Sequence, residues 1–110
     1  MRQKIEVDED KEYLEFTLID NGNKIGSATV EKQTGHRWYL AYIAINHRYQ
    51  GHGYGTSLLT AVHNLAKRRA VKQIYLSPLP DSIPFWESKK YQPDMFWKES
   101  DGEGFWWKHL

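Results

Sequence analysis

A run of closely spaced glycines in the middle of the chain has the composition of a phosphate-binding loop. It lies between an apolar run and an amphipathic run, and it reads Arg48-Tyr49-Gln50-Gly51-His52-Gly53-Tyr54-Gly55-Thr56. Glycines allow the main chain to turn tightly with successive amide N–H groups pointing inward, and a helix that follows adds the positive end of its dipole. Such a loop suits a pyrophosphate group.

Two well-known phosphate-binding fingerprints do not match this loop. It contains no GK[ST] sequence, which excludes a Walker loop. A dinucleotide fingerprint, GxGxxG, would need a third glycine after Gly51 and Gly53, at the position where Thr56 stands. Taken alone, the glycines also fit a tight connection between a strand and a helix that binds no ligand.

The segments around the loop predict a strand, a helix and a second strand. Residues 38–45 are apolar on both faces, which predicts a central strand covered on both sides. Residues 72–76 predict a strand parallel to it, reached by a right-handed crossover. The glycine loop then lies at the carboxyl end of the first strand, where sheets of this kind bind ligands. The helix between the strands is indicated by apolar residues at helical spacing, namely Leu58, Leu59, Val62, Leu65 and Ala66.

Turn-forming residues predict a hairpin before this unit. Residues 13–19 alternate between polar and apolar side chains and are followed by Asn21-Gly22, a strong tight-turn dipeptide. The returning strand is expected over residues 24–30.

After the unit, Pro78 and Pro80 interrupt the chain, and Asp81 is predicted to cap a short helix over residues 82–90. Two further strands, over residues 95–98 and 104–108, flank a sequence rich in turn formers and predict a second hairpin.

Length and composition exclude several classes of protein. With 110 residues, the chain is expected to form one domain over residues 1–110. It has no cysteine, which excludes disulfides and thiolate metal sites and fits a reducing cytoplasm. We expect no membrane association, because no run approaches the roughly 20 apolar residues of a membrane span. A formal charge of +1 argues against a nucleic-acid partner.

Two motifs together resemble the GNAT superfamily of N-acetyltransferases. The QxxGxG pattern of residues 50–55 resembles the family's acyl-CoA loop, [QR]xxGx[GA]. Residues 85–91, FWESKKY, resemble the later FYEKxGF segment, with identity at Phe85 and Glu87 and aromatic residues at Trp86 and Tyr91. The two motifs occur in the same order as in the family, and the resemblance covers roughly residues 13–110.

The resemblance implies an α/β (α+β) fold of the GNAT acyl-CoA N-acyltransferase type. This fold has a mixed, mostly antiparallel central sheet, a central helix after the QxxGxG loop and a short C-terminal helix. Family members usually begin with a strand and two helices before the first hairpin, and this sequence has no space for those helices. It therefore resembles a small member whose acceptor side is either open or completed by a second subunit, so that monomer and homodimer are both expected.

By resemblance, acetyl-CoA is the acyl donor and is held mainly by the protein backbone. The main chain of Ile43, Ala44 and Ile45 would pair with the pantetheine arm, although plain core packing also explains the two isoleucines. Phe85 and Trp86 would wall the pocket. The pyrophosphate would bind the amides of the loop, namely Gln50, Gly51, His52, Gly53, Tyr54, Gly55 and Thr56.

The residues that transfer protons are the least defined part of the site. Many family members protonate the leaving thiolate with the tyrosine of the FYE segment, and here Trp86, which is no acid, takes that position. Ser82 is a candidate because residues four apart share a helix face, although helix capping or simple solvent exposure also explains a serine there. Tyr39 could order a water that accepts the amine proton, and a core tyrosine is the alternative. No metal is expected, because the histidines show no ligand spacing.

Three functions remain open on the sequence. The first is transfer of an acetyl group from acetyl-CoA to a primary amine of a small molecule or protein. The second is a CoA-binding module of this fold without transferase activity, suggested by Trp86 in the acid position. The third is a small aromatic-rich interaction domain without a cofactor, which Trp97, Trp106 and Trp107 could serve if exposed together. The near-neutral charge favours no acceptor class.

Overall fold

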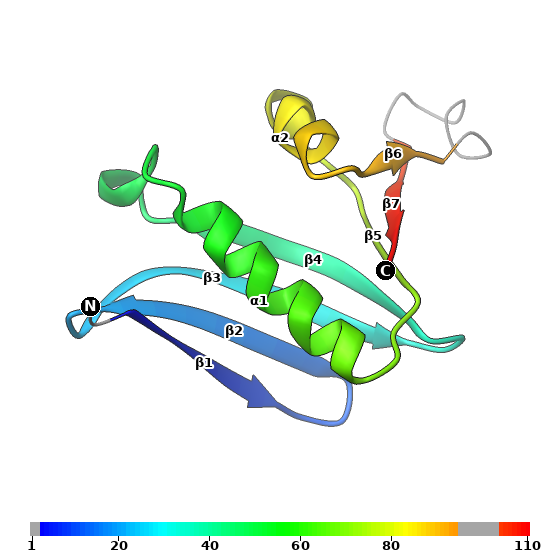
Figure 1. The fold of residues 1–110 in the computed structure, drawn as a ribbon, viewed down its shortest axis with the longest axis horizontal. Coiled ribbons are helices and arrows are strands. Elements are labelled where there is room, and N and C mark those ends of the chain that lie inside the picture. The colour runs from blue at the N-terminus through cyan, green and yellow to red at the C-terminus, as the bar shows by residue number, and fades with distance from the viewer. Residues whose placement is uncertain (1–2, 95–103) are drawn as a thin grey trace.

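A seven-stranded sheet carries one long helix in the part of the chain, residues 3–94 and 104–110, that the computed structural model describes. The strand order is β1-β2-β3-β4-β5-β7-β6, and every neighbouring pair is antiparallel except β4 and β5 (Figure 1). This is the mixed, mostly antiparallel sheet that was predicted. The elements are β1 (Gln3–Glu9), β2 (Tyr13–Asp20), β3 (Asn23–Gln33), β4 (Arg37–Ile45), η1 (His47–Tyr49), α1 (Tyr54–Arg68), β5 (Gln73–Leu76), η2 (Pro80–Ser82), α2 (Ile83–Ser88), β6 (Gln92–Pro93) and β7 (Trp106–His109).

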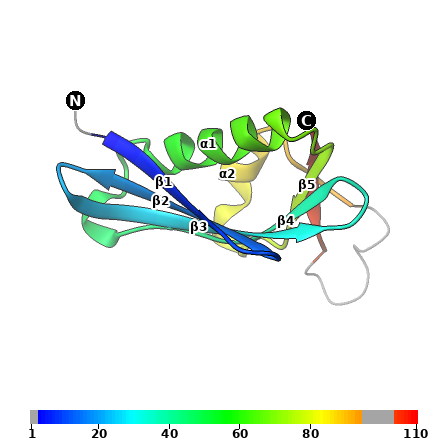
Figure 2. The same ribbon diagram turned by 90° about the horizontal axis from the view of Figure 1, so that it is seen from below.

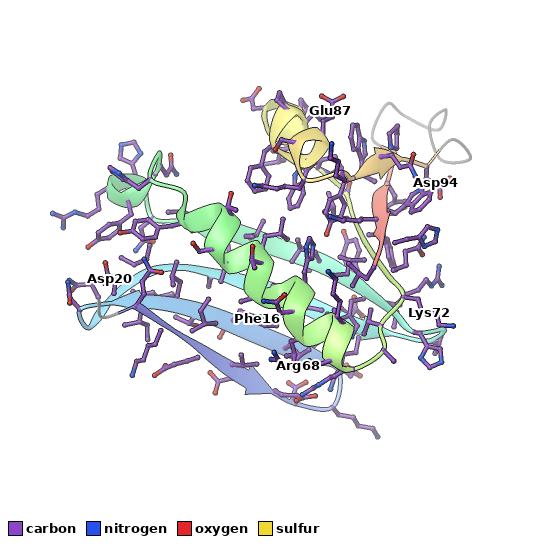
Figure 3. All side chains as sticks on the ribbon, viewed as in Figure 1. Phe16, Asp20, Arg68, Lys72, Glu87 and Asp94 are labelled. Carbon is purple, nitrogen blue, oxygen red and sulfur yellow. The ribbon has the colours of Figure 1, made fainter. Side chains whose placement is uncertain are left out.

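The core lies between α1 and one face of the sheet (Figure 2). The predicted alternation of β2 is confirmed, because Leu14, Phe16 and Leu18 are at most 1% exposed. Phe16 lies between β2 and the helix (Figure 3). The predicted stripe of α1 is buried at Leu58, Leu59, Val62 and Ala66, whereas Leu65 is half-buried. Each fully buried large aliphatic side chain contributes about 1.5–3 kcal/mol of transfer free energy, so this layer is the main source of stability.

The first hairpin is confirmed in detail. Asn21 and Gly22 have φ values of 53° and 81°, the two positive angles that a tight hairpin turn requires. The turn pairs Asp20 with Asn23, and β2 and β3 then run antiparallel along their length.

Strand β1 was not predicted. It pairs with β2 along its full length, from Gln3 opposite Asp20 to Glu9 opposite Leu14. The sequence does contain a signal for this strand, because Ile5 and Val7 alternate with charged residues. The alternation is short and is followed by a polar segment, so it was missed. Only residues 10–12 join β1 to β2, in a turn where the Asp10 carboxylate accepts hydrogen bonds from the amides of Glu12 and Tyr13 at 2.8 and 2.7 Å. The chain therefore passes from β1 to β2 with no helix between them.

The prediction that β4 is covered on both faces is wrong. Trp38 and Leu40 are buried toward α1, but Tyr42, on the opposite face, is 54% exposed. Thr29 pairs with Tyr42 while Val30 pairs with Leu40, which leaves Ala41 as an extra residue in a bulge. This face of β4 is therefore open to solvent at Tyr42.

The predicted cap and length of the helix after β5 are also wrong. Asp81 does not cap the helix, because Pro80 starts a 3₁₀ turn that contains it. Helix α2 begins at Ile83 and ends at Ser88, shorter than predicted, and no side-chain hydrogen bond caps it.

The C-terminal hairpin is described only in part. The predicted strand over 95–98 lies outside the described residues. Strand β7 is confirmed and pairs with β5 on one side and with β6 on the other.

At one point β3 and β4 lie unusually close together. A Cβ atom at Gly26 would clash with the Ala44 carbonyl oxygen and would lie 2.6 Å from Ile45 Cδ1. Only glycine fits there without displacing the end of β4.

A histidine and a tyrosine join α1 to the segment after α2. His63 Nε2 and the Tyr91 hydroxyl are 2.7 Å apart. Burial, followed by the positive charges of Lys108 and Lys67, lowers the pKa of His63 to about 4. The folded protein therefore keeps this imidazole neutral over a pH range in which the unfolded chain protonates it.

We predict that His63 makes the protein less stable as the pH falls. Its ordinary pKa is 6.5 and its folded pKa is about 4, so the unfolded state binds more protons between these values and stability is lost on acidification through this window. Urea unfolding at neutral pH and at about pH 5 measures this loss. His63→Gln keeps a polar partner for Tyr91 without titrating, so its loss should be smaller, and an equal loss in both proteins would contradict the assignment.

Candidate active site

The glycine loop has the geometry of an anion site. Gly51 and Gly53 have φ values of 84° and 81°, and α1 begins at Tyr54 directly after them. No side chain caps α1, and its first turn contains no acidic residue. The amide N–H groups of that turn have no partner within the helix, so they and the positive end of the dipole are available to an anion.

A cavity of about 330 Å³, here named the loop cavity, opens at this helix start. The Gln50 side chain fixes the loop to the end of β4, because its Nε2 donates a hydrogen bond to the Ile45 carbonyl oxygen at 3.1 Å. A Cβ atom at Gly51 or Gly53 would meet nothing within 4 Å, so backbone conformation rather than space requires glycine there. The loop cavity is lined by Ile45, Tyr49, Gln50, Gly51, Gly53, Tyr54, Gly55, Thr56 and Phe85.

Beyond the loop, β4 separates from β5. The two strands pair only from Arg37 opposite Gln73 to Tyr39 opposite Tyr75. The bulge at Ala41 follows directly, and the two strands run apart (Figure 1). Residues 40–45 consequently have no strand partner on the β5 side, and their backbone edge faces a cleft.

The cleft continues the loop cavity along β4. Its first part, about 500 Å³ and here named the β4 cleft, is lined by Ile43, Ala44, Ile45, Gln50, Gly55, Ser82, Phe85 and Trp86. Its second part, about 400 Å³ and here named the distal cavity, is lined by Leu40, Ala41, Tyr42, Ile43, Ala44, Leu76, Ser77, Pro78, Leu79, Ser82 and Trp86. Shared lining residues connect each cavity to the next. Together they run from the start of α1 past the open edge of β4 to the end of β5.

Most of the residues predicted to bind the donor lie along this path. The exception is His52, which is exposed and lines none of the three cavities; its ring centroid lies 6.2 Å from that of Tyr54. Ile43, Ala44 and Ile45 are half-buried and line the β4 cleft, and Ile43 and Ile45 also pack against the core. Tyr54 also anchors the helix start, since its hydroxyl lies 3.4 Å from the Asp20 carboxylate.

Ser82 and Trp86 share a face of the helical segment, as their spacing indicated. Trp86 Nε1 donates a hydrogen bond to Ser82 Oγ at 3.1 Å, and Ser82 Oγ donates to the Leu79 carbonyl oxygen at 2.7 Å. Trp86 is 4% exposed and packs edge-on against Phe85 and Tyr91. The indole is thus a fixed wall of the cleft, with the serine hydroxyl beside it.

The structure does not bring Tyr39 to the cleft. Its ring packs against Tyr75 and Phe105, with centroid distances of 5.0 and 6.3 Å, on the face of the sheet away from α1. It lines none of the three cavities. Glu87 of the FWE segment is exposed and points from α2 away from the sheet (Figure 3).

Several residues of the distal cavity were missed by the sequence analysis. Tyr42 and Leu79 line it, yet nothing in their local sequence marks them, because the bulge and the separation of β4 from β5 are products of the whole sheet. Tyr49 of the loop cavity was also missed, although it directly precedes the QxxGxG motif. Among the described residues no group of acidic residues and histidines could hold a metal ion. No helix in the described part of the chain is long and apolar enough to cross a membrane.

Several solved structures share this fold. An acetyltransferase from Bacillus subtilis in complex with CoA is 12% identical, with 99% of each chain covered and a TM-score of 0.82. The ribosomal-protein-S18-alanine N-acetyltransferase from Escherichia coli is 21% identical over 93% of this chain and 72% of that one, with a TM-score of 0.78. The PaiA N-acetyltransferase from Thermoplasma acidophilum in complex with coenzyme A is 14% identical over 90% of this chain, with a TM-score of 0.75.

This chain spans only 62% of the PaiA chain. At these identities the similarity concerns the fold. The sequence matches no curated protein. The family model described as "Acetyltransferase (GNAT) family" matches residues 2–91, which include the glycine loop, the open strand and the FWE segment. On this match, and with the fold in agreement, the chain belongs to the GNAT acetyltransferase family.

Proposed function

We propose that this protein transfers an acetyl group from acetyl-CoA to a primary amine. The observation that carries the proposal is the continuous path from the uncapped start of α1 along the open edge of β4. An anion site and an unpaired strand edge in this order suit the pyrophosphate and the amide-rich pantetheine arm of coenzyme A. Two of the structures with this fold were solved with coenzyme A, which supports a donor of this kind.

In this proposal the protein backbone makes most of the contacts with acetyl-CoA. Amides of residues 50–56 bind the pyrophosphate, and the main chain of residues 43–45 pairs with the pantetheine arm. An amide of this strand donates a hydrogen bond to the thioester oxygen and stabilises the negative charge that develops there. In the transfer, the amine nitrogen bonds to the carbonyl carbon and the carbon–sulfur bond breaks. The nitrogen loses a proton and the sulfur gains one, giving an N-acetyl amide and the free thiol of CoA.

Ser82 is our candidate for protonating the leaving thiolate, since this residue lines both the β4 cleft and the distal cavity. To do so, its hydroxyl would turn from the Leu79 carbonyl oxygen, to which it donates in this structure, toward the sulfur. Trp86 shapes the cleft. Tyr39 lines none of the three cavities, so its position does not support the role of ordering a water for the amine.

The two alternatives make different use of the same features. A CoA-binding module without transferase activity would keep the loop cavity and the β4 cleft. An aromatic interaction domain has less support, because Trp106 and Trp107 are half-buried within the sheet and Trp97 lies outside the described residues.

We predict that the protein binds acetyl-CoA and releases thiol in the presence of a primary amine. Calorimetric titration with acetyl-CoA measures binding, and a thiol-reactive dye measures transfer across a panel of amines. Binding without amine-dependent release would leave only the CoA-binding module. If acetyl-CoA does not bind at millimolar concentration, both the transferase and the CoA-binding module are ruled out.

We predict that Gly53→Ala weakens acetyl-CoA binding about tenfold or more, because an alanine at this φ of 81° is strained by about 1–2 kcal/mol and the loop amides would move to relieve it. Gly22 is the matched control. It has the same φ, lies in the β2–β3 turn, and a Cβ atom added there would also meet nothing within 4 Å. Gly22→Ala should lower thermal stability similarly and leave the dissociation constant unchanged. Equal affinities for both variants would show that the loop does not hold the donor.

We predict that Ser82→Ala lowers kcat about tenfold while acetyl-CoA binding is kept, because the variant loses the hydroxyl beside the cleft. Ser88→Ala is the control, since Ser88 Oγ donates to the Phe85 carbonyl oxygen of the same helix at 2.6 Å and lines neither part of the cleft. If kcat were the same in both variants, Ser82 would be a partner of Trp86 and the thiolate would take its proton from water.

A further inference from the structure

The distal cavity is almost free of ionisable groups. Its lining contains no Asp, Glu, Lys, Arg or His among the described residues, and the Tyr42 hydroxyl is its one titratable group. The β4 cleft, which precedes it, is lined by no charged residue either. Along this part of the path the described residues therefore offer neither a counter-ion for a cation nor a carboxylate or imidazole base.

Exposed apolar side chains gather at the same cavity. Tyr42 is 54% exposed and Leu79 is 75% exposed, and these are the two highest values among the exposed large apolar residues of the described chain. One comes from β4 and the other from the segment between β5 and η2, so they contribute from opposite walls. Exposed apolar groups that line a cavity are typical of a ligand-binding surface.

These two features restrict the amine that can enter. Ordinary alkylamines such as the lysine side chain have pKa values near about 10.4, so they are cationic at neutral pH. Moving such a cation from water into an apolar cavity is costly without a partner of opposite charge, and it must also lose a proton before its nitrogen can attack. An amine that is already neutral at this pH carries no charge into the cavity and needs to lose no proton before it attacks.

We propose that the acceptor is a weakly basic amine carried on an aromatic or other apolar body, with arylamines as the chemical class. The proposal rests on the proposed function. The donor occupies the loop cavity and the β4 cleft, and the apolar body of the acceptor lies in the distal cavity between Tyr42 and Leu79. The lone pair of the neutral nitrogen attacks the thioester carbon and the carbon–sulfur bond breaks. The nitrogen's proton passes to solvent, and the thiolate takes one up.

Comparing three amines as acceptors separates the effect of nitrogen basicity from that of molecular shape. p-Toluidine and 4-methylbenzylamine have similar apolar bodies but differ in nitrogen basicity, and 1,4-diaminobutane is a dication without a ring. At neutral pH we expect kcat/KM for p-toluidine to exceed that for 4-methylbenzylamine about tenfold or more. The rate with 4-methylbenzylamine should rise with pH as its neutral fraction grows. The diamine should be the poorest acceptor.

Substitutions in the distal cavity test whether the acceptor binds there. Tyr42→Ala and Leu79→Ala remove exposed side chains and should raise KM for p-toluidine about fivefold or more, with the dissociation constant of acetyl-CoA unchanged. Val7→Ala is the control, since Val7 is 43% exposed on β1 and lines none of the three cavities. A readout besides activity is the binding of the product, 4-methylacetanilide, to the CoA-loaded protein, which should weaken in the same two variants.

The outcomes distinguish this proposal from the one on which it rests. If acetyl-CoA does not bind, the proposed function fails and this inference fails with it. If acetyl-CoA binds but the diamine or 4-methylbenzylamine is preferred at neutral pH, only the inference is overturned. If acetyl-CoA binds and another primary amine reacts but p-toluidine does not, again only the inference is overturned. If acetyl-CoA binds and no primary amine reacts, both the inference and the transferase function are overturned. Unchanged KM and product binding in both cavity variants would also overturn it.

Discussion

The separation of β4 from β5 is the constraint on which the candidate site depends. Parallel pairing stops after Tyr39 and Tyr75, and the bulge at Ala41 turns the rest of β4 away from its neighbour. A strand inside a sheet normally satisfies its backbone on both sides. Here one side of β4 is left open toward the cleft, near the start of α1, whose first amide groups also have no partner within the helix. The fold thus concentrates unsatisfied backbone groups along a single line, which is the property that a long, amide-rich ligand needs.

The distribution of side chains follows from this use of the backbone. Where the main chain binds the ligand, side chains are free to vary as long as glycine is kept at positive φ. Gly51 and Gly53 of the loop meet this condition, and in the function that we propose the half-buried residues 43–45 act through their peptide groups. Side chains matter more at the far end, where Trp86 is fixed by Ser82 and by two aromatic neighbours and Tyr42 stands exposed. In the function that we propose, donor binding and acceptor choice are therefore separate properties of the two ends of one path.

The sequence predicted those parts of the fold that depend on local signals. The Asn21-Gly22 turn, the buried stripe of α1 and the parallel return to β5 all follow from residues close together in the chain. The errors arose for two different reasons. The prediction for Tyr42 failed because the bulge in β4 depends on its pairing with β3, which the sequence of residues 38–45 does not reveal. The prediction for Asp81 failed locally, because Pro80 begins a 3₁₀ turn that contains it. Tyr39 was placed near the chemistry because its strand was, whereas its side chain points to the opposite face of the sheet.

The glycine at position 26 fixes one wall of the cleft. Because β3 presses against β4 at that point, the Ala44–Ile45 end of the open strand has no room to retreat. The opposite wall is held as well, because Trp86 is hydrogen-bonded to Ser82 and packed against Phe85 and Tyr91. Under the function that we propose, room for a longer acyl chain would therefore require smaller side chains in η2 and α2 rather than a shift of β4.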